Sequence, residues 1–235
     1  MTMPQPIPFF PATSDFPSGT DTPRDLLERC LARFEEFEPA VGAFVCHDIG
    51  AARAAADLAT KRWRAGRPLS PIDGMPVAIK DIIETADMPT EQGSPLFVGW
   101  RTGRDAASVA ALREAGAVIL GKAVTTEFAS TEPRGTYNPW DTKRTPGSSS
   151  GSAAAVSCGM VPAALGSSAQ LATGAYDSLL AVNQNRVCET KFPDTGRDLA
   201  DLSVRMGSRI IGVRHQRRDR AHHDLVGQVH GASLL

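Results

Sequence analysis

This 235-residue chain has little cysteine: four residues, none of them in a Cys-x-x-Cys pair. They are Cys30, Cys46, Cys158 and Cys188. Their wide spacing argues against a disulfide scaffold or a zinc knuckle and is typical of a reducing cytoplasm. The five histidines show no metal-ligand spacing either. We therefore expect a cytoplasmic protein without a bound metal.

The chain also lacks an excess of charge and a long apolar run. It has 25 Lys+Arg and 26 Asp+Glu, a formal net charge of −1, which excludes a nucleic-acid partner held by overall positive charge. No stretch reaches the roughly 18–20 apolar residues of a membrane span, and no apolar segment follows a basic N-terminus. These absences predict neither nucleic acid nor a membrane among its partners.

One nucleotide-binding pattern fails on its residue types. Residues 116–122 have the Gly-x4-Gly-Lys spacing of a phosphate-binding loop. The four residues between the glycines are those of a buried strand, and Ala123 stands where such a loop needs the Ser or Thr that binds magnesium. The sequence therefore predicts no bound cofactor.

Three regions of the chain differ in pattern. Residues 1–21 hold five prolines with Ser and Thr, and are predicted to form an extended arm. Residues 22–166 alternate helical and strand patterns, whereas the apolar positions of residues 167–235 lose clear periodicity. That last region carries eight Arg, one Lys and four of the five His. It is either a solvated helix with a basic face or a tail that does not belong to the preceding domain.

The middle region predicts an α/β fold. Its first helix starts at the N-cap Thr22 with Pro23 in the first turn, and Pro39 is expected just past its end. The other expected elements are strands at 43–46, 75–79 and 117–120, helices at 49–65 and 105–115, and an apolar helix at 153–160 that follows a Gly/Ser loop at 147–152. This alternation predicts a largely parallel sheet covered by helices.

Two motifs in this region suggest chemistry. Lys80 ends the buried strand of the run Gly-Met-Pro-Val-Ala-Ile-Lys-Asp. Such a lysine either reaches solvent, pairs with Asp81, or sits in a dry site that lowers its pKa and lets it act as a base. The second motif, Thr-Pro-Gly-Ser-Ser-Ser-Gly-Ser at 145–152, is either a flexible linker or a loop that brings hydroxyl and backbone N–H groups to a site. A linker is disfavoured because the run enters an apolar helix directly.

Together these motifs resemble the amidase signature family, the Ser–cis-Ser–Lys amide hydrolases. That family includes bacterial amidases and the A subunit of the aspartyl/glutamyl-tRNA amidotransferase. The resemblance covers roughly residues 22–166, and its further motifs are Gly121-Lys122, Glu127-Phe128-Ala129 and Tyr137-Asn138-Pro139-Trp140. It implies an amidase-signature-like mixed sheet covered by helices, incomplete in this chain and followed by about 70 irregular residues.

The resemblance also implies roles for particular positions. Lys80 would be the base, acting through a serine next to a cis peptide bond. The serine loop looks one glycine short of the family's pattern, so counting back from Ser152 makes this cis-serine Ser148, which is slightly favoured, and counting forward from Gly147 makes it Ser149. The nucleophilic serine should fall at Ala172, where there is no hydroxyl and no Gly-Ser-Ile/Val-Arg follows.

The chain thus resembles a hydrolase of carbon–nitrogen amide bonds that lacks its nucleophile. We expect a small-molecule amide as the substrate of the family's chemistry and no activity from this chain. The alternatives are a non-catalytic fragment or regulatory protein that retains half of the fold, and the A subunit of a tRNA-dependent amidotransferase. A reading frame shifted over residues 173–179 permits Gly-Ser-Val/Ile-Arg, so the tail is either a frameshift product or a diverged segment. The sequence leaves the oligomeric state open.

Overall fold

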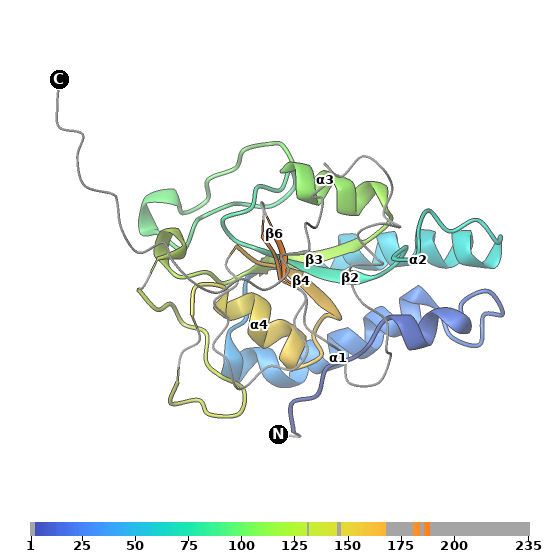
Figure 1. The fold of residues 1–235 in the computed structure, drawn as a ribbon, viewed down its shortest axis with the longest axis horizontal. Coiled ribbons are helices and arrows are strands. Elements are labelled where there is room, and N and C mark those ends of the chain that lie inside the picture. Colours follow the sequence, from blue (N-terminus) through green and yellow to red (C-terminus); the bar gives the residue numbers. More distant parts are fainter. Residues whose placement is uncertain (1–2, 131, 145–146, 168–180, 184–185, 189–235) are drawn as a thin grey trace, which may run out of the picture.

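The computed structural model describes residues 3–130, 132–144, 147–167, 181–183 and 186–188 (Figure 1). A four-stranded sheet in the order β1–β3–β2–β4 organises them. Its strands are β1 (Phe44–His47), β2 (Pro76–Lys80), β3 (Val118–Ala123) and β4 (Ala163–Leu165). β1 runs antiparallel to β3, whereas β2 is parallel to both β3 and β4, so the sheet is mixed.

Helices cover both faces of this sheet, which confirms the predicted fold class. They are α1 (Pro23–Val41), α2 (Ile49–Arg64), α3 (Ala107–Glu114) and α4 (Ser150–Ser157). α3 lies on one side of the strands, and α1 and α4 lie on the other (Figure 1). No helix among the described residues is long and apolar enough to cross a membrane.

The two faces of β2 belong to two separate hydrophobic cores. Val77 and Ile79 pack in the core that contains Val109 of α3, whereas Ala78 packs in the core that contains α1 and α4. Successive side chains of a strand point to opposite faces, so Lys80 emerges on the same face as Ala78, towards α4. The apolar pattern of one five-residue strand therefore decides which helix the lysine faces.

The first helix starts as expected but ends later. The Thr22 side chain accepts a hydrogen bond from the backbone N–H of Asp25, and Pro23 is the first helical residue. The helix then continues through Pro39 to Val41 and ends at Gly42, which has a φ of 62°. Proline lacks an N–H and therefore removes one hydrogen bond of the last turn, but the apolar face of α1 still packs and Val41 is buried.

The N-terminal arm is packed on the domain. It forms a 3-10 helix at Phe10–Ser14, and the side chains of Phe9 and Phe16 are 3% and 0% exposed. Phe16 makes an edge contact with Trp63 of α2, with ring centroids 5.5 Å apart. Burial of each phenylalanine ring contributes roughly 1.5–3 kcal/mol and fixes the proline-rich segment on the domain. The segment is therefore not the purely extended arm that was expected.

Two other departures concern the region around the serine loop. The apolar helix begins at Ser150, three residues before its expected start, so the last serines of the loop form its first turn. The short strand β4 was not expected from the sequence at all. In the tail, β5 (Ala181–Asn183) and β6 (Arg186–Cys188) form an antiparallel pair. The rest of the predicted irregular tail lies outside the described residues.

Candidate active site

The site lies where β2 ends against the N-terminus of α4. Residue pairs between the parallel strands β2 and β3 end at Lys80 and Ala123, and the chain after β3 runs beside the serine loop. The backbone N–H of Thr126 and the hydroxyl of Thr125 both donate to the carbonyl oxygen of Ser148, at 3.2 and 3.1 Å. The loop is therefore fixed to the segment that follows β3.

Gly151 makes this close approach possible. Its N–H donates to the carbonyl oxygen of Val124 at 3.0 Å. A Cβ at this position would overlap the backbone of Ala43 and Val124, and no side chain is there to give way. The glycine of the serine run is thus required for packing between α4 and the sheet.

The structure brings Lys80 to both serines that the sequence singles out. The ammonium Nζ of Lys80 donates to Ser149 Oγ at 3.0 Å and to Ser148 Oγ at 3.2 Å, although nearly 70 residues separate lysine and serines in the chain. Ser149 is 2% exposed and precedes the first residue of α4. The catalytic roles predicted for these residues remain a proposal.

A third hydroxyl, which was not among the predicted site residues, also reaches the lysine. Ser167 Oγ accepts a hydrogen bond from Lys80 Nζ at 2.6 Å, the shortest of the three contacts. The backbone N–H of Ser167 donates to Ser149 Oγ at 3.4 Å, so the two serines also contact one another. Strand pairing explains this contact, because Ser167 lies two residues after Leu165, which pairs with Ile79 immediately before Lys80.

Burial shifts the protonation equilibrium of Lys80 towards the neutral amine. Its side chain is fully buried, and that burial lowers the pKa of Lys80 from 10.5 to about 8. Within the described part of the chain no carboxylate forms an ion pair with it. A neutral amine with a lone pair directed at hydroxyl groups can accept a proton from them, which is the task of a general base.

Asp81, the alternative partner of Lys80, is bound to a different lysine. Asp81 Oδ1 lies 3.1 Å from Lys122 Nζ, and both side chains are buried. Lys122 also donates to the carbonyl oxygen of Pro89 at 2.8 Å and to Thr90 Oγ1 at 2.7 Å. A register shift between β2 and β3 places Lys122 on the face away from α4. Of the alternatives for Lys80, the pairing with Asp81 is therefore not the one that the structure shows.

Two expected features of the site are not found in the described residues. Their peptide bonds are all trans, so the cis bond expected at Ser148 or Ser149 is not present. A non-prolyl cis bond costs about 3–4 kcal/mol relative to trans, and both hydroxyls already reach Lys80 without it. Ala172, where the nucleophile was expected, lies outside the described residues.

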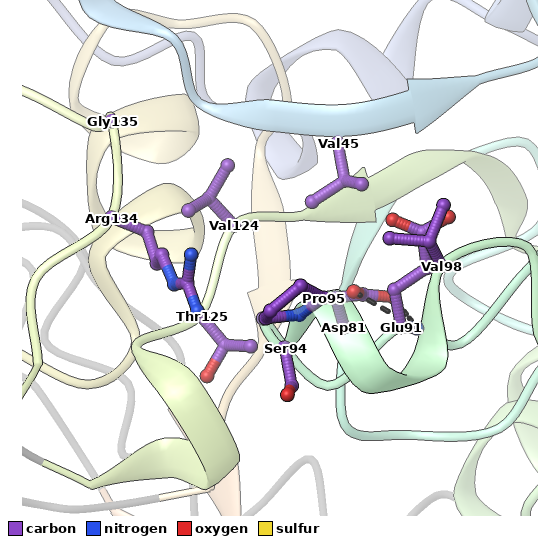
Figure 2. A pocket seen from close by; sticks show the side chains of 11 residues that line it. Val45, Asp81, Glu91, Ser94, Pro95, Val98, Val124, Thr125, Arg134 and Gly135 are labelled. Atoms are coloured by element: carbon purple, nitrogen blue, oxygen red, sulfur yellow. Dashed lines mark hydrogen bonds between the residues drawn. The ribbon is translucent and has the colours of Figure 1, made fainter.

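A cleft opens beside Asp81, the residue that follows Lys80 (Figure 2). It has a volume of about 310 Å³, and its wall includes Asp81 and Thr125 but not Lys80. Figure 2 shows Arg134 at one side of this cleft and Glu91 at the other, with valine and proline side chains between them. No group of three or more His, Cys, Asp or Glu in the described ranges is placed to hold a metal ion.

Comparison with known proteins gives one family. The model of a family described as Amidase matches residues 25–169, which is more than half of the chain. The match ends shortly after Ser167 and includes Lys80 and the whole serine loop.

Two similar curated proteins are A subunits of the glutamyl-tRNA(Gln) amidotransferase. The chain is 47% identical over 156 residues to the A subunit of the glutamyl-tRNA(Gln) amidotransferase of Chloroflexus aggregans, which covers 63% of this chain and 32% of that protein. The corresponding subunit of Anaeromyxobacter sp. is 45% identical over 149 residues, covering 60% of this chain and 30% of the relative. The matched part of this chain thus spans about a third of these relatives.

Several solved structures have a similar fold, and some of them are amidases by name. One, from a vestigial protein complex that bears on the origins of an s-triazine catabolic enzyme, has a TM-score of 0.64 and 34% identity, and the match covers 69% of this chain and 37% of the other. The peptide amidase of Stenotrophomonas maltophilia has a TM-score of 0.59 and 31% identity, covering 64% of this chain and 34% of the peptide amidase.

Proposed function

This chain belongs to the amidase family, and on that premise we propose that Lys80 and the serines beside it form the proton-transfer part of an amide-hydrolysing site. The observation that carries the proposal is the buried lysine, held within 3.0 Å of Ser149 without a carboxylate partner in the described residues. A buried amine beside hydroxyl groups has the properties of a general base for amide cleavage.

In this proposal Lys80 is the base and Ser149 relays the proton. Two observations support Ser149 over Ser148: it is buried with Lys80, and its Oγ contacts both Lys80 and the backbone of Ser167. Its position at the start of α4 also fixes the hydroxyl, because the helix is anchored to the sheet through Gly151. Ser148 is only half-buried and is the alternative relay.

We further propose that the chain as it stands does not turn over amides by the family's route. Position 172, where the resemblance puts the nucleophile, is alanine, which has no hydroxyl to form an acyl-enzyme. Loss of a covalent nucleophile lowers turnover on the order of 10⁴–10⁶-fold in comparable hydrolases. A shifted reading frame in the tail remains the proposed origin of this loss, with a diverged tail as the alternative.

The relatives give two enzyme candidates for the family's chemistry. The names of the curated relatives favour the A subunit of a tRNA-dependent amidotransferase, which would act together with other subunits. The solved amidases favour a hydrolase of small-molecule amides, in which this chain would need no partner. A cytoplasmic location fits both candidates. The third candidate, a non-catalytic protein that retains part of the fold, would keep the site but never release ammonia.

The test is ammonia release from a panel of simple primary amides. Three proteins are compared: the chain as it stands, a version whose reading frame is restored after Gly166, and the restored version carrying Lys80→Ala. We expect no release from the first, release from the second, and none from the third. Lys80-dependent release by the chain as it stands would overturn the proposed silence. Silence of a folded, frame-restored protein would overturn a hydrolase that acts without partner subunits.

Resequencing of the gene across codons 160–185 decides the origin of the tail independently of any assay. A single inserted or deleted base that restores Gly-Ser-Ile/Val-Arg would establish a frameshift. An uninterrupted frame that matches the present sequence would establish a diverged tail instead.

A further inference from the structure

We propose that Ser167 is a nucleophile in this chain, activated by Lys80, and that it forms a covalent ester with acyl donors that carry a good leaving group. The proposal rests on the proposed role of Lys80 as a base. It adds a reacting atom that neither the family match nor the expected position 172 supplies.

The first support is the geometry around Lys80. Ser167 Oγ lies 2.6 Å from Lys80 Nζ, closer than Ser149 Oγ at 3.0 Å and Ser148 Oγ at 3.2 Å. A nucleophile and its base must lie within about 2.6–3.2 Å of one another for direct proton transfer. Ser149, which accepts from the N–H of Ser167, fixes the backbone that carries this hydroxyl.

The second support is accessibility. Lys80 and Ser149 are 0% and 2% exposed, so neither can meet a substrate directly, whereas Ser167 is partly exposed. A nucleophile must be accessible to the substrate, whereas its base can be buried behind it. Ser167 and Lys80 are arranged in this way. Ser148 is also partly exposed and is therefore the competing nucleophile that an experiment must separate from Ser167.

The third support is that the fold itself fixes the proximity. β2 and β4 are parallel neighbours, with Ile79 opposite Leu165. Residues that follow these positions leave the sheet at the same edge, which brings Lys80 and Ser167 together from opposite ends of an 87-residue separation. Their contact therefore depends on strand register and not on the conformation of a long loop.

The chemistry balances without a further reactant. The neutral amine of Lys80 takes the proton from Ser167 Oγ while that oxygen attacks the carbonyl carbon of the donor. The bond to the leaving group then breaks with its electron pair, and a phenolate leaving group departs without needing a proton. The products are an acyl ester of Ser167, a phenolate and the protonated Lys80. An amide is a harder substrate, because its nitrogen must be protonated before it leaves.

The probe for this experiment is p-nitrophenyl acetate, offered to the full chain. We expect one acetyl group per chain on Ser167, located by peptide mapping after intact-mass measurement, together with one equivalent of p-nitrophenolate. Hydroxylamine removes an acetyl ester from serine but leaves an acetyl amide on lysine, so it separates the proposed product from background labelling of surface lysines. The rate should rise as the pH increases through about 8, where Lys80 loses its proton.

Variants identify the residue. Ser167→Ala should abolish the hydroxylamine-sensitive label. Ser148→Ala should still give a label on Ser167, at a lower rate if Ser148 takes part in the proton transfer through its contact with Lys80. Lys80→Met should slow it about 10²–10⁴-fold, the usual contribution of a general base. Ser167→Cys should restore acylation, as a thioester on the same residue. This last variant excludes the explanation that Ser167→Ala merely misfolds.

Three results would overturn the inference. A hydroxylamine-sensitive label on Ser148 that depends on Lys80 would leave the proposed base intact and refute only Ser167. A label whose rate is unchanged in Lys80→Met would refute the base as well. Acetylation confined to lysine side chains would also refute the inference, because it would show that no serine of the site is activated.

Discussion

Replacing Lys80 by methionine should make this protein more stable near neutral pH, and the gain should disappear at high pH. Lys80 is fully buried without a carboxylate partner in the described residues, and burial lowers its pKa from 10.5 to about 8. That difference corresponds to about 3 kcal/mol of destabilisation of the charged form in the folded state. Methionine has a similar length and carries no charge into the site.

The direction of the pH dependence follows from proton binding. Below pH 8 the lysine is protonated in both the folded and the unfolded chain, so the full cost of burying the charge is present. Between pH 8 and 10.5 the unfolded chain keeps its proton but the folded chain has lost it, and folding stability rises with pH. Above 10.5 the lysine is neutral in both states and the cost is gone.

The assay is urea denaturation of the wild type and Lys80→Met at half-unit steps from about pH 7 to 11, at constant ionic strength. The difference between their free energies of unfolding should change by about 3 kcal/mol across this interval in favour of the wild type. The subtraction removes the titration of tyrosines, cysteines and Lys122, which both proteins share. Lys61→Met, at an exposed position on α2, is the matched control and should give a flat difference. A flat difference for Lys80→Met as well would refute the buried, low-pKa lysine and with it the proposed base.

Three further predictions concern stability and are measured by the same denaturation assay near pH 7. Asp81→Asn should lower the free energy of unfolding by about 3–5 kcal/mol, because it leaves the buried Lys122 without its carboxylate partner. Adding Lys122→Met should recover most of this loss, and independent, additive effects would contradict the pairing. Gly116→Ala should destabilise the fold by at least about 2 kcal/mol more than Gly66→Ala. Both glycines have positive φ, but of the two only Gly116 would place a Cβ against the carboxylate of Asp73. Equal costs would contradict this packing. Thr22→Ala should cost about 1 kcal/mol and Thr22→Ser almost nothing; equal losses would argue against the N-cap.

The sequence was most informative where local rules decide the structure. The start of α1 follows from Thr22 and Pro23, and the strands β2 and β3 follow from short apolar runs between turn residues. The mixed sheet covered by helices, which the family resemblance implied, is also confirmed. The end of α1 was misplaced because Pro39 lowers helix propensity in the last turn without preventing it, and packing of the apolar face outweighs that local cost.

Positions set by strand pairing were harder to predict. β4 has only three residues between Pro162 and Gly166, a run too short for its residue pattern to identify a strand. Without β4 next to β2, nothing in the sequence brings Ser167 to Lys80. The serine then looks like the first residue of an unrelated tail, although the family match extends to residue 169.

The motif residues are a different case, because the sequence motifs predicted that they would lie close together but did not predict the role of each serine. Lys80, Ser148 and Ser149 do meet in space, as the resemblance implies. The proposed choice of relay serine rests on burial and on the neighbours of each hydroxyl. These depend on where α4 begins, and that boundary differs from the expected one by three residues.

The two buried lysines differ in their partners, since Lys122 contacts a carboxylate and Lys80 contacts hydroxyl groups. Burial lowers the pKa of both Lys80 and Lys122, but for Lys122 the carboxylate of Asp81 opposes that shift and favours the charged form. For Lys80, burial alone accounts for the lowered pKa, and its partners are hydroxyls. Because Lys80 and Asp81 are adjacent on alternating sides of one chain, the carboxylate that would hold Lys80 in its charged form is directed away from it. The alternation of side chains along β2 buries Ile79 on one face and places Lys80, the proposed proton acceptor, on the other face beside the serines.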